Sequence, residues 1–285
     1  MGDFHSDLRA LSQAIERELA AGRLDFPTVL DLSLRIRQAA DDPNSSIETI
    51  AGLIRIEPVV SARVIRMANS VIFNPAGRNV GSISESIQRI GVSQVRVIAL
   101  VVAMDQLAQE HRSKAMRDLA RDVWQNSIDV AAWAYAITRR LRTDKPETAL
   151  LAGLMTNIGQ LYLIARVGQY PALAQNVREF ADIVELWNPA LTRAILEEMA
   201  LPAHMLDAID YHNPYGGRWP PQSLDEILFI ARLAAESENP FATKEREARS
   251  KLLESTKATL TDPTFEDLLA SAAQERDELL AVLSV

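Results

Sequence analysis

Residues 149–161 are the most informative part of the chain, with the sequence Ala-Leu-Leu-Ala-Gly-Leu-Met-Thr-Asn-Ile-Gly-Gln-Leu. Four of the aliphatic residues recur at intervals of three and four: Leu150, Leu154, Ile158 and Leu161. This spacing is typical of one face of an α-helix. Most of the neighbouring positions are apolar as well, so we expect the middle of a helix that is buried in the core.

Two glycines and two neutral polar residues interrupt this apolar stretch. Gly153 and Gly159 each lower helix stability by about 1 kcal/mol relative to Ala, which indicates that something packs closely against the backbone there. Thr156 and Asn157 lie between them, at a depth where polar groups need hydrogen-bond partners. They either hydrogen-bond within the helix bundle or contact a ligand, and the sequence leaves both interpretations open.

The rest of the chain also has helical patterns. Serine and glutamate are spaced as in a capping box at Ser45–Glu48 and at Ser82–Glu85, Pro58 suits the first turn of a helix, and Gly91 suits a left-handed C-cap. No alternating run bounded by turn residues predicts a strand. The sequence therefore predicts an all-α protein. Besides the helix that contains residues 149–161, the expected helices are 7–21, 26–36, 47–54, 58–68, 82–91, 93–109, 113–142, 171–186, 189–200, 203–211, 224–237, 244–260 and 264–283.

Composition narrows the class of protein. The chain has 285 residues, of which 48% are hydrophobic and 24% charged, as in a globular protein with a substantial core. It has no cysteine, which excludes disulfides and thiolate metal ligands, and its net charge of -8 argues against nucleic acid as a general partner. The start of the chain is polar and the longest apolar run is only Val97–Met104, so we expect a cytoplasmic protein with no membrane partner.

Several sequence blocks occur in a fixed order along the chain. They are Phe26-Pro27, Glu57-Pro58, residues 64–70, residues 82–91, Trp124 with Ser127, residues 153–159, Leu201-Pro202 and residues 208–212. Together they resemble the HDOD family, the HD-related output domain of bacterial signalling proteins. The resemblance implies a helical extension at 1–25, an N-terminal helical subdomain at 26–110, an HD-like helical subdomain at 111–237 and an acidic helical extension at 238–285.

Residues 153–159 also resemble the Gly-Leu-Leu-His-Asp-Ile-Gly signature of the HD superfamily of metal-dependent phosphohydrolases, with Thr156-Asn157 in place of His-Asp. In that superfamily, His and Asp side chains hold divalent metals that activate a water molecule. The resemblance implies that the remaining ligand positions fall on Ser127, Asn188, Tyr211 and His212. Neutral amides and hydroxyls are poor ligands for transition metals. We therefore expect no catalytic residue, no metal and no cofactor.

These features favour a non-catalytic module of bacterial signal transduction that binds another protein. One alternative is an active metal-dependent phosphohydrolase or phosphodiesterase with an unusual ligand set, namely Asp129, Asp207, Asp210 and His212. A second alternative is a sensor that binds a nucleotide or another small molecule in the polar cavity where metals would lie. For His212, a packing or capping role before Asn213-Pro214 is the simpler interpretation.

A partner surface is expected where the two halves meet, because grooves between helical bundles accept helices and loops. Arginine and tryptophan are the residue types that often dominate binding energy. The arginines could instead form a solvated helix face, and Trp219 could pack back on the bundle. The candidate residues are Arg63, Arg66, Arg78, Tyr215, Arg218 and Trp219.

Overall fold

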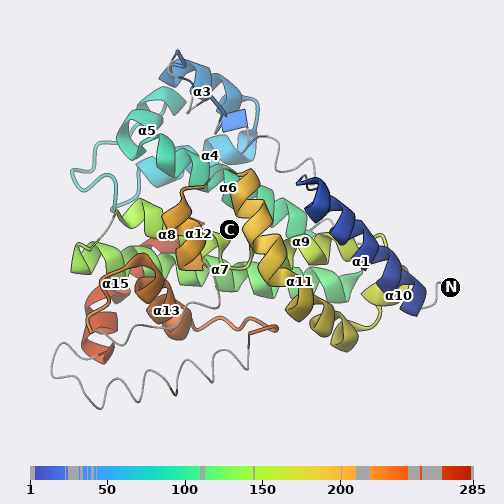
Figure 1. Ribbon diagram of the computed structural model, residues 1–285. Helices are drawn as coiled ribbons and strands as arrows, with labels where there is room; N and C mark the ends of the chain where they lie inside the picture. Colours follow the sequence, from blue (N-terminus) through green and yellow to red (C-terminus); the bar gives the residue numbers. More distant parts are fainter. Residues whose placement is uncertain are drawn as a thin grey trace.

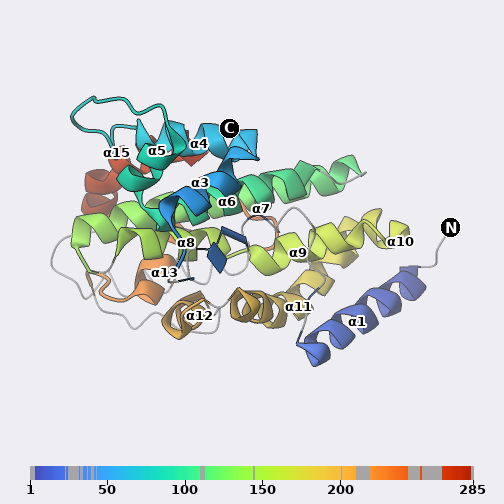
Figure 2. The same cartoon turned by 90° about the horizontal axis from the view of Figure 1, so that it is seen from above.

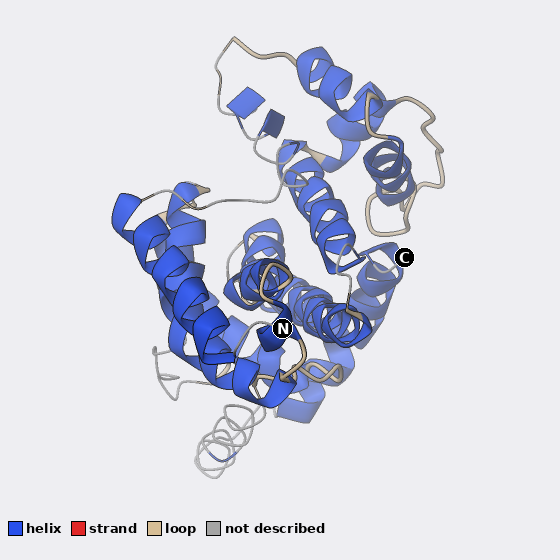
Figure 3. Cartoon of the chain, turned by 90° about the vertical axis from the view of Figure 1, so that its right-hand side faces the viewer, coloured by secondary structure: helices blue, strands red, loops and turns tan. Residues whose placement is uncertain are grey.

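The computed structural model describes residues 4–22, 24, 32, 35–36, 38–39, 42, 44–109, 113–143, 145–199, 201–209, 219–242, 251 and 265–283. Across these residues the chain consists of helices joined by turns and loops, without a strand (Figure 3). The all-α fold that the sequence predicts is therefore confirmed. The helices expected at 26–36 and 244–260 lie mostly outside the described residues.

Among the described residues, four helices form the N-terminal bundle, which lies at the top of Figure 1: α3 (Ile47–Arg55), α4 (Pro58–Ala68), α5 (Ile83–Ile90) and α6 (Val92–Gln109). Their inward aliphatic residues, such as Ile54, Val64 and Ile87, are buried. Helix α6 packs on α4 and α5 and also on helices of the second half. It is therefore the main link between the bundle and the rest of the molecule, to which α15 adds a smaller contact with α4.

The N-terminus of α3 corrects one sequence prediction. Ser46, not Ser45, is the N-cap, and its capping-box partner is Thr49 rather than Glu48. Both serine pairs have the same spacing of three residues. What separates them is the extended backbone at Ser46, with φ -103° and ψ 162°, a local conformation that spacing alone does not specify.

Of the other predicted caps of this bundle, two are present and one differs. Pro58 occupies the first turn of α4, and the Ser82 hydroxyl accepts a hydrogen bond from the Glu85 amide at 3.2 Å. Gly91 ends α5 with a φ of 82°, which favours glycine. Its ψ of 157° lies outside the left-handed helical region, so Gly91 is not the left-handed cap that the sequence predicts.

The second half is organised around α7 (Lys114–Leu141), which runs through the middle of the molecule in Figures 1 and 2. Every residue of α7 from Ser127 to Thr138 is buried. Other helices pack around this segment, chiefly α8 (Pro146–Met155), α9 (Ile158–Val167), α13 (Leu224–Ala234) and α15 (Phe265–Leu283). Helices α10 (Pro171–Ala174), α11 (Val177–Glu198) and α12 (Ala203–Ile209) complete this half.

The contact between α7 and α8 explains Gly153. A Cβ atom on this residue would lie 2.4 Å from the Cα of Ala131 and 2.8 Å from its backbone nitrogen. No side chain fits at that distance, so glycine permits the two backbones to pack directly against each other. The close approach that the sequence predicts for Gly153 is therefore present.

Residues 149–161 do not form one helix, contrary to the sequence prediction. Helix α8 ends at Met155 and α9 begins at Ile158, and Asn157 between them has φ -113° and ψ 17°. The Thr156 hydroxyl donates a hydrogen bond to the Gly153 carbonyl at 2.8 Å, which turns the Thr156 side chain back on the end of α8. The apolar spacing continues through the break because both helices bury their aliphatic residues in the same core.

Helix α11 corrects a second boundary. The sequence predicts two helices that meet near Pro189, whereas the chain forms the short α10 and then one long α11 with Pro189 inside it. Proline removes one backbone hydrogen bond and commonly bends or ends a helix. Here the residues around it are held by the core: Asn188, Leu191 and Thr192 are all buried.

Both terminal helices pack on the second half. Helix α1 (Phe4–Ala21) lies against α10 and α11, and α15 lies along α7. The Glu18 carboxylate accepts hydrogen bonds from the Arg166 guanidinium at 2.7 Å and from the Tyr162 hydroxyl. The Asp7 carboxylate accepts one from the Ala172 amide at 2.9 Å, at the start of α10. Polar contacts therefore fix α1 to the core.

Among the described residues, one continuous helical stretch, Pro146–Val167, is long and apolar enough by composition to cross a membrane. A second candidate exists only if Ile83–Ile90 and Val92–Gln106, which are bent by 110° at their junction, are counted as one span. Within the fold, 83% of the most apolar window of Pro146–Val167 is buried. This stretch packs against α7, so its hydrophobicity is accounted for by the core.

Candidate functional site

Two of the positions that the HD resemblance marks meet in the structure. Ser127 from α7 and Asn157 from the break between α8 and α9 are both buried. The Asn157 side-chain amide donates one hydrogen bond to the Ser127 hydroxyl at 3.0 Å and another to the Asn126 side-chain oxygen at 3.1 Å. The Ser127 hydroxyl in turn donates to the Val123 carbonyl at 3.0 Å. Both donor hydrogens of Asn157 are therefore used within the protein.

Asn239 closes this group from the segment that follows α13. Its side-chain amide donates to the Asn157 oxygen at 3.1 Å and to the Gln160 oxygen at 2.9 Å. Its own oxygen accepts from the Phe241 amide at 2.9 Å, which fixes its orientation. We call Asn126, Ser127, Asn157, Gln160 and Asn239 the amide cluster. No local sequence pattern identifies Asn239 as a partner of Asn157.

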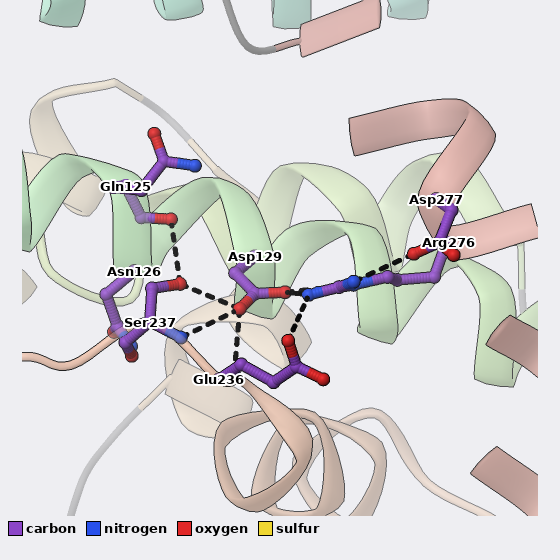
Figure 4. A network of polar contacts seen from close by, with 7 residues as sticks. All are labelled: Gln125, Asn126, Asp129, Glu236, Ser237, Arg276 and Asp277. Carbon is purple, nitrogen blue, oxygen red and sulfur yellow. Dashed lines mark hydrogen bonds and ion pairs between the residues drawn. The ribbon is translucent and has the colours of Figure 1, made fainter. Parts of the chain in front are cut away.

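Asp129 lies two residues after Ser127 on α7, and its carboxylate is also buried. One oxygen accepts hydrogen bonds from the Glu236 amide at 2.8 Å, the Ser237 amide at 3.1 Å and the Ser237 hydroxyl at 2.7 Å (Figure 4). The other oxygen pairs with the Arg276 guanidinium at 2.6 Å. The negative charge of Asp129 is therefore compensated by the protein itself.

The remaining HD-like positions lie elsewhere or outside the described residues. Thr156 is buried and donates to the end of α8. Asn188 lies beside Gly159: a Cβ on Gly159 would be 2.6 Å from the Asn188 side-chain oxygen. That oxygen also accepts from the Thr192 hydroxyl at 3.1 Å. Tyr211 and His212 lie outside the described residues.

A divalent metal does not fit the described residues at this position. The amide cluster consists of neutral groups, and the amide hydrogens of Asn157 and Asn239 point at one another's acceptors and at their neighbours. The carboxylate nearby is held by Arg276. Across the described residues, no three His, Cys, Asp or Glu side chains lie close enough together to hold a metal ion. Neutral amides without carboxylate or imidazole beside them are weak ligands for such ions.

The unusual ligand set considered from the sequence is not assembled among the described residues. Asp129 is paired with Arg276, and Asp207 is exposed on α12. Asp210 and His212 lie outside the described residues. Two of the four groups can therefore be placed: Asp129 is buried in an ion pair, and Asp207 is exposed.

The candidate partner residues separate into three groups. Arg63 is buried and pairs with Asp105 of α6, whose other oxygen accepts from the Trp124 indole at 2.7 Å. Its guanidinium is therefore not available at a surface, contrary to the sequence prediction. Arg66 and Arg78 are exposed. Trp219 packs partly against the core, and Tyr215 and Arg218 lie outside the described residues.

The N-terminal bundle contains a pocket that the sequence does not predict. It is lined by Leu32, Arg35, Leu53, Ile56, Glu57, Val60, Ala99, Val102, Ala103 and Gln106. None of the candidate partner residues contributes to this lining. The pocket lies in the N-terminal bundle and has no part in the amide cluster.

Solved structures with a similar fold come from several bacteria. A protein from Shewanella amazonensis SB2B, provisionally described as a metal-dependent phosphohydrolase, is 22% identical, with a TM-score of 0.74 over 98% of this chain and 100% of that chain. An HDOD domain protein of unknown function from Geobacter sulfurreducens is 22% identical, with a TM-score of 0.57 over 94% and 96%. A protein from Marinobacter aquaeolei VT8, provisionally described as a signal transduction protein, is 19% identical, with a TM-score of 0.53 over 100% and 67%.

These identities support a shared fold and do not transfer an activity. No curated protein matches the chain. The HDOD domain, in contrast, matches residues 26–215, which is most of the chain. This range includes α3 to α12 and both the Ser127 and the Asn157 positions. The chain therefore belongs to the HDOD domain family.

Proposed function

We propose that this protein is a non-catalytic module of bacterial signal transduction that acts by binding another protein. The observation that carries the proposal is the hydrogen bonding of Asn157. Its two amide hydrogens go to Asn126 and Ser127, and its oxygen accepts from Asn239. At the position where the HD superfamily places an Asp ligand, this chain has a buried structural amide.

Membership of the HDOD family supports the signalling part of the proposal. The similar fold of the Marinobacter protein, provisionally described as a signal transduction protein, agrees with it. The phosphohydrolase description belongs to the Shewanella protein. Hydrolysis at the corresponding position here would need ligands that the amide cluster lacks, so we favour binding over catalysis.

Metal loading tests the non-catalytic part. The purified full-length chain is incubated with Mn²⁺, Mg²⁺ or Zn²⁺, and metal content, melting temperature and hydrolysis of bis(p-nitrophenyl) phosphate are measured. We expect no stoichiometric metal, no increase in melting temperature and no hydrolysis. The control variant is Asn157→Ala. Hydrolysis by the wild type that disappears in Asn157→Ala would place a working site at the amide cluster and overturn the proposal.

A ligand screen tests the sensor alternative. A ligand that binds only the native state must raise the melting temperature. Nucleotides and cyclic dinucleotides are therefore added separately to the wild type and to Asn239→Ala, which opens the amide cluster. We expect no increase for the wild type, because its cluster is already filled by protein groups. An increase that requires Asn239 would support a nucleotide sensor in place of a protein-binding module.

A further inference from the structure

Arg276 on α15 forms a hydrogen-bonded ion pair with Asp129 on α7. Its Nε and Nη2 atoms lie 3.1 and 2.6 Å from the same carboxylate oxygen (Figure 4). The two side chains are 12% and 3% exposed, so water screens the pair weakly. The guanidinium also lies 5.3 Å from the centre of the Trp133 ring, which adds a cation–π contact from α7.

The charges around Arg276 favour the protonated guanidinium. Burial lowers the pKa of Arg276, but hydrogen bonds to Asp277 and Asp129 outweigh it, and the pKa lies above its usual value. Asp277 accepts from Nη1 at 2.8 Å, and Glu236 lies 4.0 Å from Nη2. Arg276 is therefore a fixed positive charge among three carboxylates.

Asp129 also links this charge to the amide cluster. It accepts from the backbone and hydroxyl of Ser237, and the Ser237 carbonyl accepts from Asn126 at 2.6 Å. Asn126 in turn accepts from Asn157 at the break between α8 and α9. A continuous series of hydrogen bonds thus runs from α15 to that break. Ser237, Asn239 and Arg276 all lie beyond residues 26–215, the part that matches the HDOD domain.

We propose that the ion pair of Arg276 with Asp129 fixes α15 to α7 and thereby holds the break between α8 and α9 in place. We call this ion pair the latch. Arg276 supplies, from within the chain, the positive charge that the buried Asp129 carboxylate needs. A buried carboxylate without a cation is strongly unfavourable. Asp129 therefore ties the fold of the matched domain to a helix that lies outside it.

A double-mutant cycle tests the latch. Asp129→Asn, Arg276→Gln and the double variant are made in the full-length chain, and each unfolding equilibrium is measured with denaturant. Each single variant leaves a buried charge or donor without its partner, whereas the double variant removes both charges. We expect a coupling of at least about tenfold in the unfolding equilibrium constant.

The matched control is the same cycle on Arg139 and Glu275. These residues also join α7 to α15, with their charged atoms 3.5 Å apart, but their side chains are 43% and 36% exposed. There we expect about twofold or less.

Hydrogen exchange separates a latch from simple packing. We expect Arg276→Gln to increase amide exchange in residues 153–161, and Arg139→Gln to leave that exchange unchanged. Arg276→Lys keeps the charge and should restore part of the protection, and it replaces Arg276→Gln if that variant does not fold. A coupling no larger than that of the control pair would overturn the proposal. Unchanged exchange at residues 153–161 while α15 exchanges faster would also overturn it.

Discussion

Asn157 shows how one residue decides what the HD-like position can do. Its neighbours present two acceptor oxygens, from Asn126 and Ser127, and one donor, from Asn239. An amide matches this set because it has two donor hydrogens and an acceptor. A carboxylate has acceptors alone and would face two oxygens. The surroundings of Asn157 therefore select an amide and disfavour the Asp of an HD enzyme.

Restoring the His-Asp pair should fail to restore an enzyme. We predict that Thr156→His with Asn157→Asp lowers stability by about 1–3 kcal/mol, because Asn126 and Ser127 lose their donor in a buried site. We predict no hydrolysis of bis(p-nitrophenyl) phosphate with Mn²⁺, because Ser127 and Asn239 supply no ligand charge. Denaturant unfolding and a colorimetric assay check these points, with Thr156→His alone as the control. Metal-dependent hydrolysis by the double variant would contradict the prediction.

Gly153 gives a second prediction at the scale of one residue. Gly153→Ala should destabilise the protein by about 1–3 kcal/mol, because the new Cβ would meet the backbone of Ala131 at 2.4 Å. Gly52 is the matched control, since it lies inside α3 and a Cβ there meets nothing within 4 Å. Gly52→Ala should stabilise the protein by about 0.5–1 kcal/mol. Equal effects of the two variants in thermal unfolding would show that the approach of α7 and α8 is not tight.

At the scale of elements, sequence periodicity predicts helices well where burial is continuous. The bounds of α4, α6 and α7 lie within a residue or two of those predicted. Periodicity fails at the break between α8 and α9, because two helices that enter the same core keep the same apolar spacing. It also fails at Pro189, where packing of the flanking residues keeps α11 continuous.

The candidate site could be predicted only in part, for a similar reason. The resemblance to the HD superfamily points to Ser127 and Asn157, and the structure places them in contact. Asn239 and Arg276 come from segments far along the chain, and no local pattern connects them with α7. The opposite error occurs at Arg63. Arg63 and Arg66 lie one turn apart and both are expected at a surface, but only Arg66 is exposed. Arg63 is buried because Asp105 of α6 pairs with it.

Helix α1 supports a prediction about an element. Glu18→Ala should cost about 3 kcal/mol, because it leaves the Arg166 guanidinium, which is 10% exposed, without its carboxylate in a buried contact. Glu16 on the same helix is exposed, and Glu16→Ala should change stability by about 0.5 kcal/mol or less. Denaturant unfolding measures both, and limited proteolysis shows whether α1 has detached. A loss of stability in Glu16→Ala as large as in Glu18→Ala would mean that helix propensity, not the ion pair, fixes α1.

At the scale of the whole molecule, the two halves differ in how their surfaces are used. The second half is covered by α1 and α15, which pack on its helices. Four of the five large hydrophobic side chains that are exposed among the described residues belong to the N-terminal bundle, and the fifth is Leu186 on α11. Two of the four lie at the corner between α3 and α4, where Ile56 is 69% exposed and Val59 is 48% exposed. Arg66 lies two turns after Val59 on α4 and is also exposed. Apolar residues beside an exposed arginine suit a partner segment with aliphatic and acidic side chains.

The corner between α3 and α4 is therefore where we predict that a protein partner binds. Arg66→Glu should weaken binding of the partner by more than about 1 kcal/mol, because it reverses the charge that meets an acidic side chain. The melting temperature should change little, since the side chain is exposed and contacts of exposed charges contribute little to stability. Arg9→Glu on α1 is the control: Arg9 is exposed too, but it lies on a helix of the other half (Figure 1). The partner is recovered from the host by crosslinking and its affinity for each purified variant is then measured by calorimetry. If Arg9→Glu weakens binding as much as Arg66→Glu, the effect comes from net charge, and the corner of α3 and α4 is not the binding surface.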